Sequence, residues 1–484
     1  MADKLPDIKT QFSEWYQDVI TQAELTDQAP VRGCMVMRPY GYAIWENIQK
    51  NLDARIKAQG YQNCAFPLLI PESFLQQEKS HVEGFAPEVA VVTHAGGSEL
   101  EEKLVIRPTS ETIIHHMFSR WIHSWRDLPM KVNQWCSVIR WEMRPRPFLR
   151  TTEFWWHECH AAHATREEAH ADLIAAHYHI YKNFIEHDLA IPVITGAKSV
   201  NEQFAGADLT MTHEGVMQDG KALQMATSHM ISQSFAKAFA MQFQDDAGIM
   251  QYPYLSSFGA TTRLIGAVIM VHGDQKGLVL PPAIAPYHIV ITPIIKATNK
   301  ERVLAHAESI KARLDTQFRV HIDATLSTPG AKFYHWEVRG VPIRIEVGER
   351  DIESNVCICV ERIDGSKTSV TTLQQPEKQT GTHTDVLQLF FAEKLESIRL
   401  KMFTKASAMQ ESWRARASDI AEFGPRIEEH GGVIQSGWCG SSECEKALKQ
   451  YKATIRCLSE EKSCTSCCVC KKPSITDCII AKSY

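Results

Sequence analysis

The chain has 484 residues, of which 44% are apolar and 23% are charged, and its formal net charge is −5. This length predicts two to four domains of ordinary globular composition, and the small negative charge argues against indiscriminate binding to polyanions. The longest apolar run, 264–271, is too short to cross a bilayer, and the N-terminus has no apolar signal core. We therefore expect a cytoplasmic protein that does not enter a membrane.

The first 282 residues have the pattern of a largely antiparallel sheet with helices. The spacing of apolar residues predicts helices at 8–23, 42–58, 167–186 and 227–243. Strands are predicted at 65–70, 104–107, 131–141, 148–156 and 264–271. Pro67 removes a ladder hydrogen bond, so its strand is expected at an edge or an interface. Few helices separate the strands, which favours an antiparallel sheet over a doubly wound parallel one.

A Pro-rich stretch, 277–286, predicts a linker to a second region. Beyond it, strands alternating with a helix predict a compact α/β domain. The strands are expected at 288–295, 318–322, 341–347 and 355–361, and the helix at 300–314. The segment 386–429 is charged and helical in pattern, and a group of cysteines follows it. We therefore expect domains at 1–282, 283–385 and 386–484.

Eight of the 14 cysteines lie between Cys439 and Cys478. A reducing compartment with one local metal site explains this distribution better than a disulfide framework. Two pairs of thiolates on two turns form a tetrahedral zinc site with no open position, which indicates a structural role. The predicted ligands are Cys439, Cys444, Cys467 and Cys470, although the spacing also allows Cys468 as the third. Cys457, Cys464 and Cys478 are interpreted as ordinary thiols.

The segment 137–154 consists of two strand-like stretches around a loop that contains Arg144, Arg146 and Arg150. Arg140 and Glu142 share one strand face, because side chains alternate along a strand. Guanidinium groups suit phosphate and carboxylate oxygens, and a carboxylate can accept from an amine such as that of adenine. A solvated, positively charged hairpin is the alternative interpretation, and this segment alone does not decide between them.

Three shorter motifs add polar groups that suit a small-molecule site. Segment 107–111 places Thr109 and Glu111 after a strand, where they suit a substrate ammonium; 224–229 and 261–266 supply small polar groups and Arg263. Together and in this order, these motifs resemble those of the class II aminoacyl-tRNA synthetases and, within them, the prolyl-tRNA synthetase family. The resemblance extends to segments 37–46, 66–73, 81–88, 148–154, 270–274 and 277–282. It is closer to the archaeal and eukaryotic form than to the longer bacterial one.

The resemblance implies an α+β fold, with a class II antiparallel sheet flanked by helices at 1–282. It implies an α/β anticodon-binding domain at 283–385 and a small α/β zinc-binding domain at 386–484. It also implies a homodimer formed through 60–67, which would give Pro67 an interface. The implied reaction activates L-proline with ATP and Mg²⁺ to prolyl-adenylate and then transfers the prolyl group to the 3′ end of tRNA(Pro).

The resemblance further implies roles for individual residues, with Arg140 and Arg263 as the catalytic pair. Arg140 would contact the α-phosphate and the proline carboxylate, Glu142 the adenine amine, and Arg150 the outer phosphates. Phe154 and Arg263 would enclose the adenine. The nucleotide and Mg²⁺ would also be approached by Thr151, Gln224, Thr227 and Thr261. The proline site would comprise Thr109, Glu111 and His229, with Trp156, His160 and Phe204 as walls.

The chain departs from the family pattern around the expected proline pocket. Segment 155–160 reads Trp-Trp-His-Glu-Cys-His where Leu-Trp-Gln-Glu-Gly-His is usual, Phe258 replaces Trp, and 225–226 replaces two glycines. The group His157, Glu158, Cys159, His160 and His163 could alternatively be a metal cluster. Strand alternation places His157 and Cys159 opposite Glu158 and His160, which favours pocket wall and core.

Two other classes of protein are alternative interpretations of this sequence. A threonyl or seryl sister synthetase would use the same sheet and ATP site. The second alternative is a catalytically silent RNA- or zinc-binding relative, and the presence of Arg140, Arg150 and Arg263 argues against it. The gap between His163 and Gln224 is too short for an editing domain.

Two interpretations are open for the basic residues Lys332, Arg339, Arg344 and Arg350: they contact RNA, or they form a solvated basic face. Tyr484 resembles the last residue of relatives whose terminal carboxylate approaches the active site.

Overall fold

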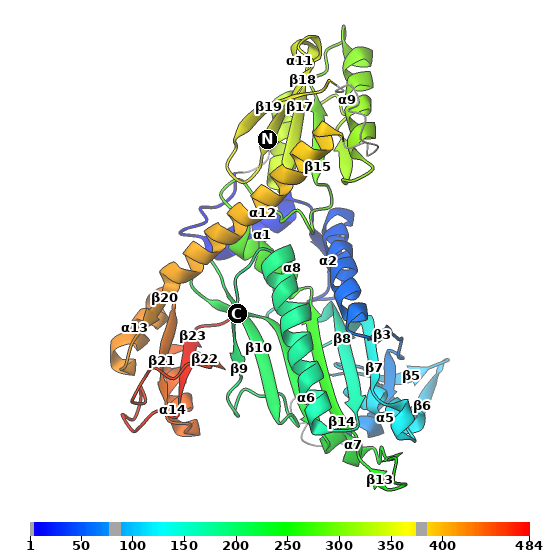
Figure 1. Ribbon diagram of the computed structural model, residues 1–484, viewed down its shortest axis with the longest axis vertical. Coiled ribbons are helices and arrows are strands. Elements are labelled where there is room, and N and C mark those ends of the chain that lie inside the picture. Colours follow the sequence, from blue (N-terminus) through cyan, green and yellow to red (C-terminus); the bar gives the residue numbers. More distant parts are fainter. Residues whose placement is uncertain (1–3, 77–88, 374–384) are drawn as a thin grey trace.

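The computed structural model describes residues 4–76, 89–373 and 385–484, so the motif at 81–88 lies outside the described residues. The molecule is elongated, with an α/β unit at one end, a broad sheet in the middle and a small unit to one side (Figure 1). A long helix, α12 (Val386–Trp413), runs diagonally between the two outer units (Figure 1). The candidate site lies on the broad sheet.

The broad sheet has eleven strands among the described residues, and all neighbours are antiparallel except the pairs β3–β7 and β20–β21 at its edges. The predicted antiparallel sheet is confirmed. In spatial order the strands are β20 (Arg414–Arg416), β21 (Val433–Trp438), β23 (Thr476–Ala481), β22 (Thr454–Leu458), β9 (Ile194–Ala197), β10 (Leu209–Val216), β11 (Ala222–Ser232), β14 (Tyr254–Thr261), β8 (Glu153–His163), β7 (Met130–Ile139) and β3 (Gln62–Asn63).

The strands of the C-terminal unit (residues 414–484) extend the sheet formed by the first part of the chain. The junction is the pairing of Leu458 in β22 with Ala197 in β9. The two backbones approach closely here, since a side chain at Gly196 would meet the Leu458 carbonyl oxygen at 2.1 Å. The C-terminal unit also contains α13 (Ile420–His430), α14 (Ser442–Ala447) and a 3₁₀ turn at Leu448–Tyr451.

Helices pack on the broad sheet as the sequence predicted for 8–23, 42–58 and 167–186. Helix α1 spans Phe12–Gln22, and α2 (Pro39–Ala58) begins at a proline, whose fixed φ suits a first turn. Helix α6 (Arg166–Ala175) starts at a capping box formed by Thr165 and Glu168. It continues as a π-helix at Ala176–Lys182 and Phe184–Asp188. Helix α5 spans Glu111–Trp121 and is followed by a 3₁₀ turn at Trp125–Asp127.

Two predictions of secondary structure were wrong. The apolar run 264–271, expected as a strand, forms α8 (Arg263–His272), and 227–243, expected as a helix, lies in β11 and α7 (Ser234–Ala238). In α8 every residue from Leu264 to His272 is buried, so no polar face reveals a helical period. Strand β11 is buried on both faces and likewise shows no alternation.

The predicted strand at 65–70 exists only at its end, and 148–156 becomes a strand only from Glu153. A three-stranded sheet has the order β4 (Leu69–Pro71), β6 (Ser98–Ile106) and β5 (Ala90–Ala95), with α3 (Glu72–Gln76) beside it. Pro67 precedes β4, and its carbonyl accepts a hydrogen bond from Arg107 at 2.9 Å. Two small antiparallel pairs complete this part: β1 (Thr26–Gln28) with β2 (Met35–Met37), and β12 (Phe243–Gln244) with β13 (Met250–Gln251).

The α/β unit beyond the linker has a five-stranded mixed sheet, as the alternating pattern predicted. Its order is β16 (Val320–Ile322), β15 (Ile289–Pro293), β17 (Ile343–Val347), β18 (Val356–Glu361) and β19 (Lys367–Thr371). Its helices are α9 (Lys300–Leu314), α10 (Pro329–Val338) and α11 (Glu349–Glu353). Leu387, Phe391 and Leu395 of α12 belong to its core. Among the described residues, no helix has both the length and the apolar character needed to cross a bilayer.

Candidate active site and metal centre

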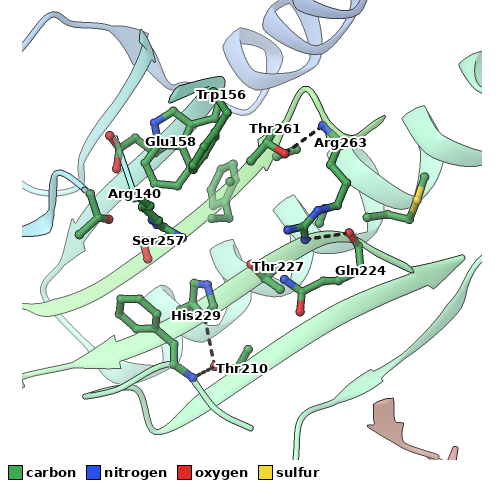
Figure 2. Close-up of a pocket in the computed structure, with 18 of the residues that line it drawn as sticks. Arg140, Trp156, Glu158, Thr210, Gln224, Thr227, His229, Ser257, Thr261 and Arg263 are labelled. Carbon is green, nitrogen blue, oxygen red and sulfur yellow. Dashed lines mark hydrogen bonds between the residues drawn. The ribbon is translucent and has the colours of Figure 1, made fainter. Parts of the chain in front are cut away.

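A cavity of about 460 Å³, called here the central cavity, lies on the broad sheet over β8, β10, β11 and β14. Figure 2 shows labelled side chains from these strands facing one common space. The structure places all the residues predicted for ATP and proline in its lining, while their separate roles remain predictions. These residues are Thr109, Glu111, Arg140, Glu142, Arg150, Thr151, Phe154, Trp156, His160, Phe204, Gln224, Thr227, His229, Thr261 and Arg263.

Arg140 lies just beyond the end of β7, where the chain leaves the sheet. Its Nε donates to the Pro108 carbonyl at 3.0 Å, and its guanidinium carbon lies 5.4 Å from the centre of the Phe154 ring. Glu142 pairs with Arg150 and accepts from the backbone N–H of Arg144 at 2.7 Å. The hairpin is therefore ordered by its own charged residues, and of its arginines Arg140 and Arg150 line the central cavity.

Arg263 is the first residue of α8 and lies on the other side of the central cavity (Figure 2). Its backbone N–H donates to Thr261 Oγ1 at 3.0 Å, and its side chain contacts the carbonyls of Leu149 and Gln224, each at 3.4 Å. Burial, and then the nearby Arg140, lower the pKa of Arg263 to about 10, so it remains charged at neutral pH. Two guanidinium groups facing one cavity favour an anionic ligand.

Carboxylates and imidazoles gather in one part of the central cavity, on the side away from Arg263. Thr109 donates to Glu111, and the carboxylate of Glu158 accepts from Gln134 Nε2 at 2.7 Å. His160 Nε2 lies 3.3 Å from Glu158 Oε2. The possible ligand atoms of Glu111, Glu158 and His160 lie within 4.8 Å of one another, which is close enough to surround a small cation. Two carboxylates at this end suit a substrate ammonium.

The aromatic wall of this end comes from Phe204 and His229. Their rings are 4.6 Å apart, and His229 Nδ1 lies 3.0 Å from Thr210 Oγ1 (Figure 2). The sequence predicted both residues, and strand alternation placed Glu158 on the same face as His160, but it did not predict Ser257 or Lys198; all three line the cavity. For Ser257 and Lys198 the sequence carries no comparable signal.

The residues of the alternative metal group separate to the two faces of β8, as alternation predicted. His157 Nδ1 lies 3.0 Å from Asn133 Oδ1, and its Nε2 lies 3.0 Å from Tyr181 Oη, beneath the sheet. Burial lowers the pKa of His157 to about 3, so the ring is neutral there. Cys159 Sγ lies 3.2 Å from the same Asn133 oxygen, whereas Glu158 and His160 face the central cavity.

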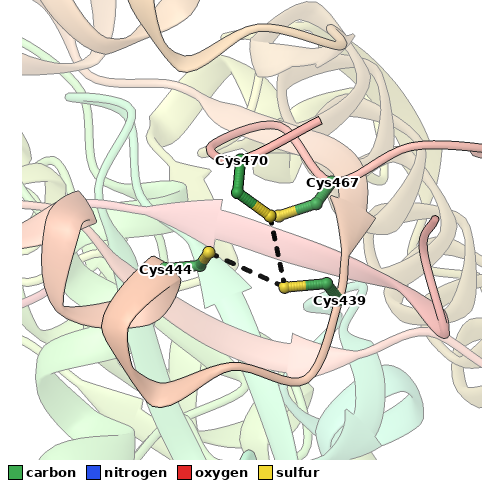
Figure 3. Close-up of side chains that lie close together, drawn as sticks. All are labelled: Cys439, Cys444, Cys467 and Cys470. Carbon is green, nitrogen blue, oxygen red and sulfur yellow. Dashed lines mark hydrogen bonds between the residues drawn. The ribbon is translucent and has the colours of Figure 1, made fainter. Parts of the chain in front are cut away.

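Four thiols of the C-terminal unit converge on one point, and they are named here the cysteine cluster: Cys439, Cys444, Cys467 and Cys470 (Figure 3). Their sulfurs all lie within 4.8 Å of one another, and Cys439 Sγ is 3.6 Å from the sulfurs of Cys444 and Cys470. Tetrahedral zinc with Zn–S bonds of about 2.3 Å needs sulfurs about 3.8 Å apart, so this set fits the metal. The sulfur of Cys467 belongs to this group and that of Cys468 does not, which favours Cys467 as the third ligand.

The basic residues considered for RNA differ in their accessibility. Lys332 is buried and donates to the carbonyls of Asp323 and Pro293 at 2.8 and 3.3 Å, so it supports the α/β unit from inside. Arg339 is also buried and pairs with Glu24. Arg344 lines a hollow of about 200 Å³ and donates to Glu346 at 2.8 Å, and Arg350 is exposed.

Family models match three successive stretches of the chain. Residues 92–272 match the tRNA synthetase class II core domain (G, H, P, S and T), and 288–378 match the anticodon binding domain. Residues 420–484 match the prolyl-tRNA synthetase C-terminal model. The antiparallel sheet, with its arginine pair above β8 and β11, and the core-domain match define a class II aminoacyl-tRNA synthetase.

Full-length relatives give the family within that class. A proline–tRNA ligase of Acetoanaerobium sticklandii is 49% identical over 478 residues, which cover 98% of this chain and 96% of the relative. One of Ruminiclostridium cellulolyticum is 46% identical, covering 100% and 99%, and one of Chlorobium phaeovibrioides is 46% identical, covering both chains completely. The chain belongs to the prolyl-tRNA synthetase family. The coverage also shows that these relatives are close to this chain in length.

Proposed function

We propose that this chain is a proline–tRNA ligase. It activates L-proline with ATP to prolyl-adenylate, releasing pyrophosphate, and transfers the prolyl group to the 3′ end of tRNA(Pro). One observation carries the proposal: the central cavity brings the guanidinium groups of Arg140 and Arg263, which lie on two sides of it, together with the carboxylates of Glu111 and Glu158. A cavity with charges of both signs can hold a nucleotide and an amino acid, with the reacting carboxylate beside Arg140.

In the proposed first step, the proline carboxylate attacks the α-phosphorus of ATP in line and pyrophosphate leaves. Arg140 would contact both the carboxylate and the α-phosphate, so it neutralises the charge that gathers as the bond forms. Thr109 and Glu111 would hold the proline ammonium, while Glu142 and Phe154 orient the adenine. Positioning supplies most of the acceleration, because this reaction needs little proton transfer.

The second step transfers the prolyl group to the tRNA. A ribose hydroxyl at the 3′ end of the tRNA attacks the carbonyl carbon of the adenylate, and AMP leaves. The match to the anticodon binding domain supports tRNA as the partner. The hollow that contains Arg344 is the proposed contact for RNA, because it is lined by three further cationic residues, Lys276, Arg362 and Lys367.

Two separate metal sites are proposed, one for Mg²⁺ and one for zinc. Gln224, Thr227 and Thr261 offer neutral oxygens beside the nucleotide end, which suit Mg²⁺ that is otherwise held by phosphates and water. Bound there, Mg²⁺ would neutralise phosphate charge. The cysteine cluster is the proposed structural zinc site, since four thiolates leave no open position for chemistry.

The proposed organisation keeps the division 1–282, 283–385 and 386–484, because each family-model match falls within one part. A cytoplasmic homodimer formed through 60–67 is also proposed. Leu68 and Leu69, next to that segment, are exposed by 45% and 42%, which supports a covered interface there.

Amino-acid-dependent exchange between ATP and pyrophosphate tests the function. The full chain is expected to exchange with L-proline and far less with threonine, serine or alanine. Exchange that responds best to threonine or serine would indicate a sister synthetase. No exchange with any amino acid would indicate an RNA- or zinc-binding protein without activity.

A further inference from the structure

A wall of the central cavity is formed by the 198–204 segment, which connects β9 to the loop before β10. Lys198, Glu202, Gln203 and Phe204 of this segment line the cavity. The Phe204 backbone N–H donates to Thr210 Oγ1 at 3.1 Å, and the same oxygen lies 3.0 Å from His229 Nδ1. The position of this segment therefore decides how Phe204 closes the end of the cavity that carries Glu111 and Glu158.

Glu445 of the C-terminal unit holds this segment in place. Its Oε1 accepts from Ser199 Oγ at 2.5 Å, and its Oε2 accepts from Asn201 Nδ2 at 2.6 Å. Glu445 is only 5% exposed and Ser199 only 1%, so water does not compete for the bond between them. Hydrogen bonds to a buried carboxylate are among the stronger ones in proteins.

A second contact fixes the start of the same segment. Lys198 Nζ donates to Glu214 Oε1 at 2.8 Å, and Arg456 of β22 donates to Glu214 Oε2 at 3.0 Å. All three side chains are buried. The C-terminal unit thus contacts Ser199 and Asn201 directly, and it reaches Lys198 through the shared carboxylate of Glu214 in β10.

The carboxylate also links the cavity to the cysteine cluster. Glu445 follows Cys444 in α14, so one short helix carries a sulfur of the cluster and the carboxylate that holds the segment. Ser442 of the same helix donates to Asn201 Oδ1 at 3.2 Å. A displacement of α14 would therefore move the wall that Phe204 forms.

We propose that Glu445 is a positioning residue, which holds the 198–204 segment so that Phe204 closes the proline end of the central cavity. The proposal rests on the proposed function and deepens it, since it assigns to the C-terminal unit an effect on proline affinity. Glu445 touches no reacting atom. Its effect is expected on KM for proline, and not on KM for ATP or on kcat.

Glu445→Gln is the first test, because it keeps the side-chain size but turns an amide N–H₂ toward one of the two donors. KM for proline in the exchange assay is expected to rise about tenfold, with kcat and KM for ATP within about twofold of wild type. The matched control is Glu443→Gln in the same helix, whose side chain is 83% exposed and pairs only with Lys446. It is expected to behave as wild type, and both variants are expected to retain the metal content of the wild type.

A double-mutant cycle and a hydrogen-exchange measurement separate positioning from general damage. Ser199→Ala and Glu445→Gln act through one contact, so the double variant is expected to resemble the more affected single variant. Additive effects would overturn the proposal. Without ATP, hydrogen exchange of the 198–204 amides is expected to be faster in Glu445→Gln than in Glu443→Gln.

Other outcomes have equally definite meanings. An unchanged KM for proline, an equal rise in KM for ATP, or loss of the metal in Glu445→Gln would each contradict the positioning role. If Glu445→Gln does not fold, Asn201→Ala at the surface is expected to raise KM for proline about threefold, and a wild-type value would contradict the proposal. Absence of exchange by the wild-type chain would contradict the proposed function itself.

Discussion

The hydroxyl of Tyr484 donates a hydrogen bond of 2.6 Å to the carboxylate of Asp219, and this bond fixes the ring beside the arginine-rich hairpin. The guanidinium carbon of Arg146 lies 5.8 Å from the centre of the Tyr484 ring, and Lys221 Nζ lies 4.9 Å from it. Arg146 belongs to the same hairpin as Arg150, which lines the central cavity. Tyr484 therefore supports the hairpin from outside the cavity.

Substitution of Tyr484 is expected to weaken ATP binding. Tyr484→Ala removes the ring beneath Arg146 and is expected to raise KM for ATP about fivefold, whereas Tyr484→Phe keeps the ring and raises it about twofold. KM for proline should stay constant, because the 198–204 segment is elsewhere. Exchange kinetics at varied ATP measure the effect, and identical KM values for the three proteins would refute it.

Arg140→Ala is expected to abolish proline-dependent exchange, with a loss of at least about a thousandfold. The variant removes the one cation proposed to contact both the carboxylate and the α-phosphate. Arg144→Ala is the control, because Arg144 is an exposed residue of the same hairpin that does not line the cavity. Near-normal exchange by Arg140→Ala would rule out the proposed role.

The zinc content of the protein is expected to depend on the four residues of the cysteine cluster. Cys467→Ser and Cys470→Ser should each lose the zinc of one site per chain, whereas Cys468→Ser should retain it, because Cys468 is outside the group of four converging sulfurs. Zinc measured by mass spectrometry of the purified proteins decides this. Retention of zinc by Cys467→Ser together with its loss from Cys468→Ser would reverse the assignment.

The buried Glu214 predicts a dependence of stability on pH. Burial raises the pKa of this carboxyl, but Arg456 and Lys198 outweigh it and hold the pKa below its ordinary value. Because the folded pKa is the lower one, the stabilisation is fully present above the unfolded pKa of about 4.3 and is lost as pH falls through the folded pKa.

Glu214→Gln is therefore expected to be less stable than wild type at pH 7, by about 3 kcal/mol, since it leaves two cations buried without a carboxylate. The difference should shrink below about pH 4. Urea unfolding of both proteins at several pH values between about 3 and about 8 measures the difference in their free energies of unfolding. Glu443→Gln provides the control, and a difference between wild type and Glu214→Gln that grows on acidification would contradict the sign of the effect.

The sequence predicted the cavity better than the contacts that support it. Arg140, Glu142 and Arg263 could be found because the chemistry of each residue type is local and the motifs occur in order. The spacing of apolar residues reveals a helix or a strand only when one of its faces is polar. Both α8 and β11 lack a polar face, and for this reason they were misassigned. The pairing of Leu458 with Ala197 and the bond from Ser199 to Glu445 join residues far apart in the chain, and no local pattern indicates them.

The order of strands in the broad sheet has a consequence for synthesis on the ribosome. Strand β23 follows both β21 and β22 in the chain, yet it lies between them. A nascent chain that stops before Thr476 would leave β21 and β22 without the strand that joins them. This part of the sheet therefore assembles only after its last strand has been made, although β21 and β22 are made first.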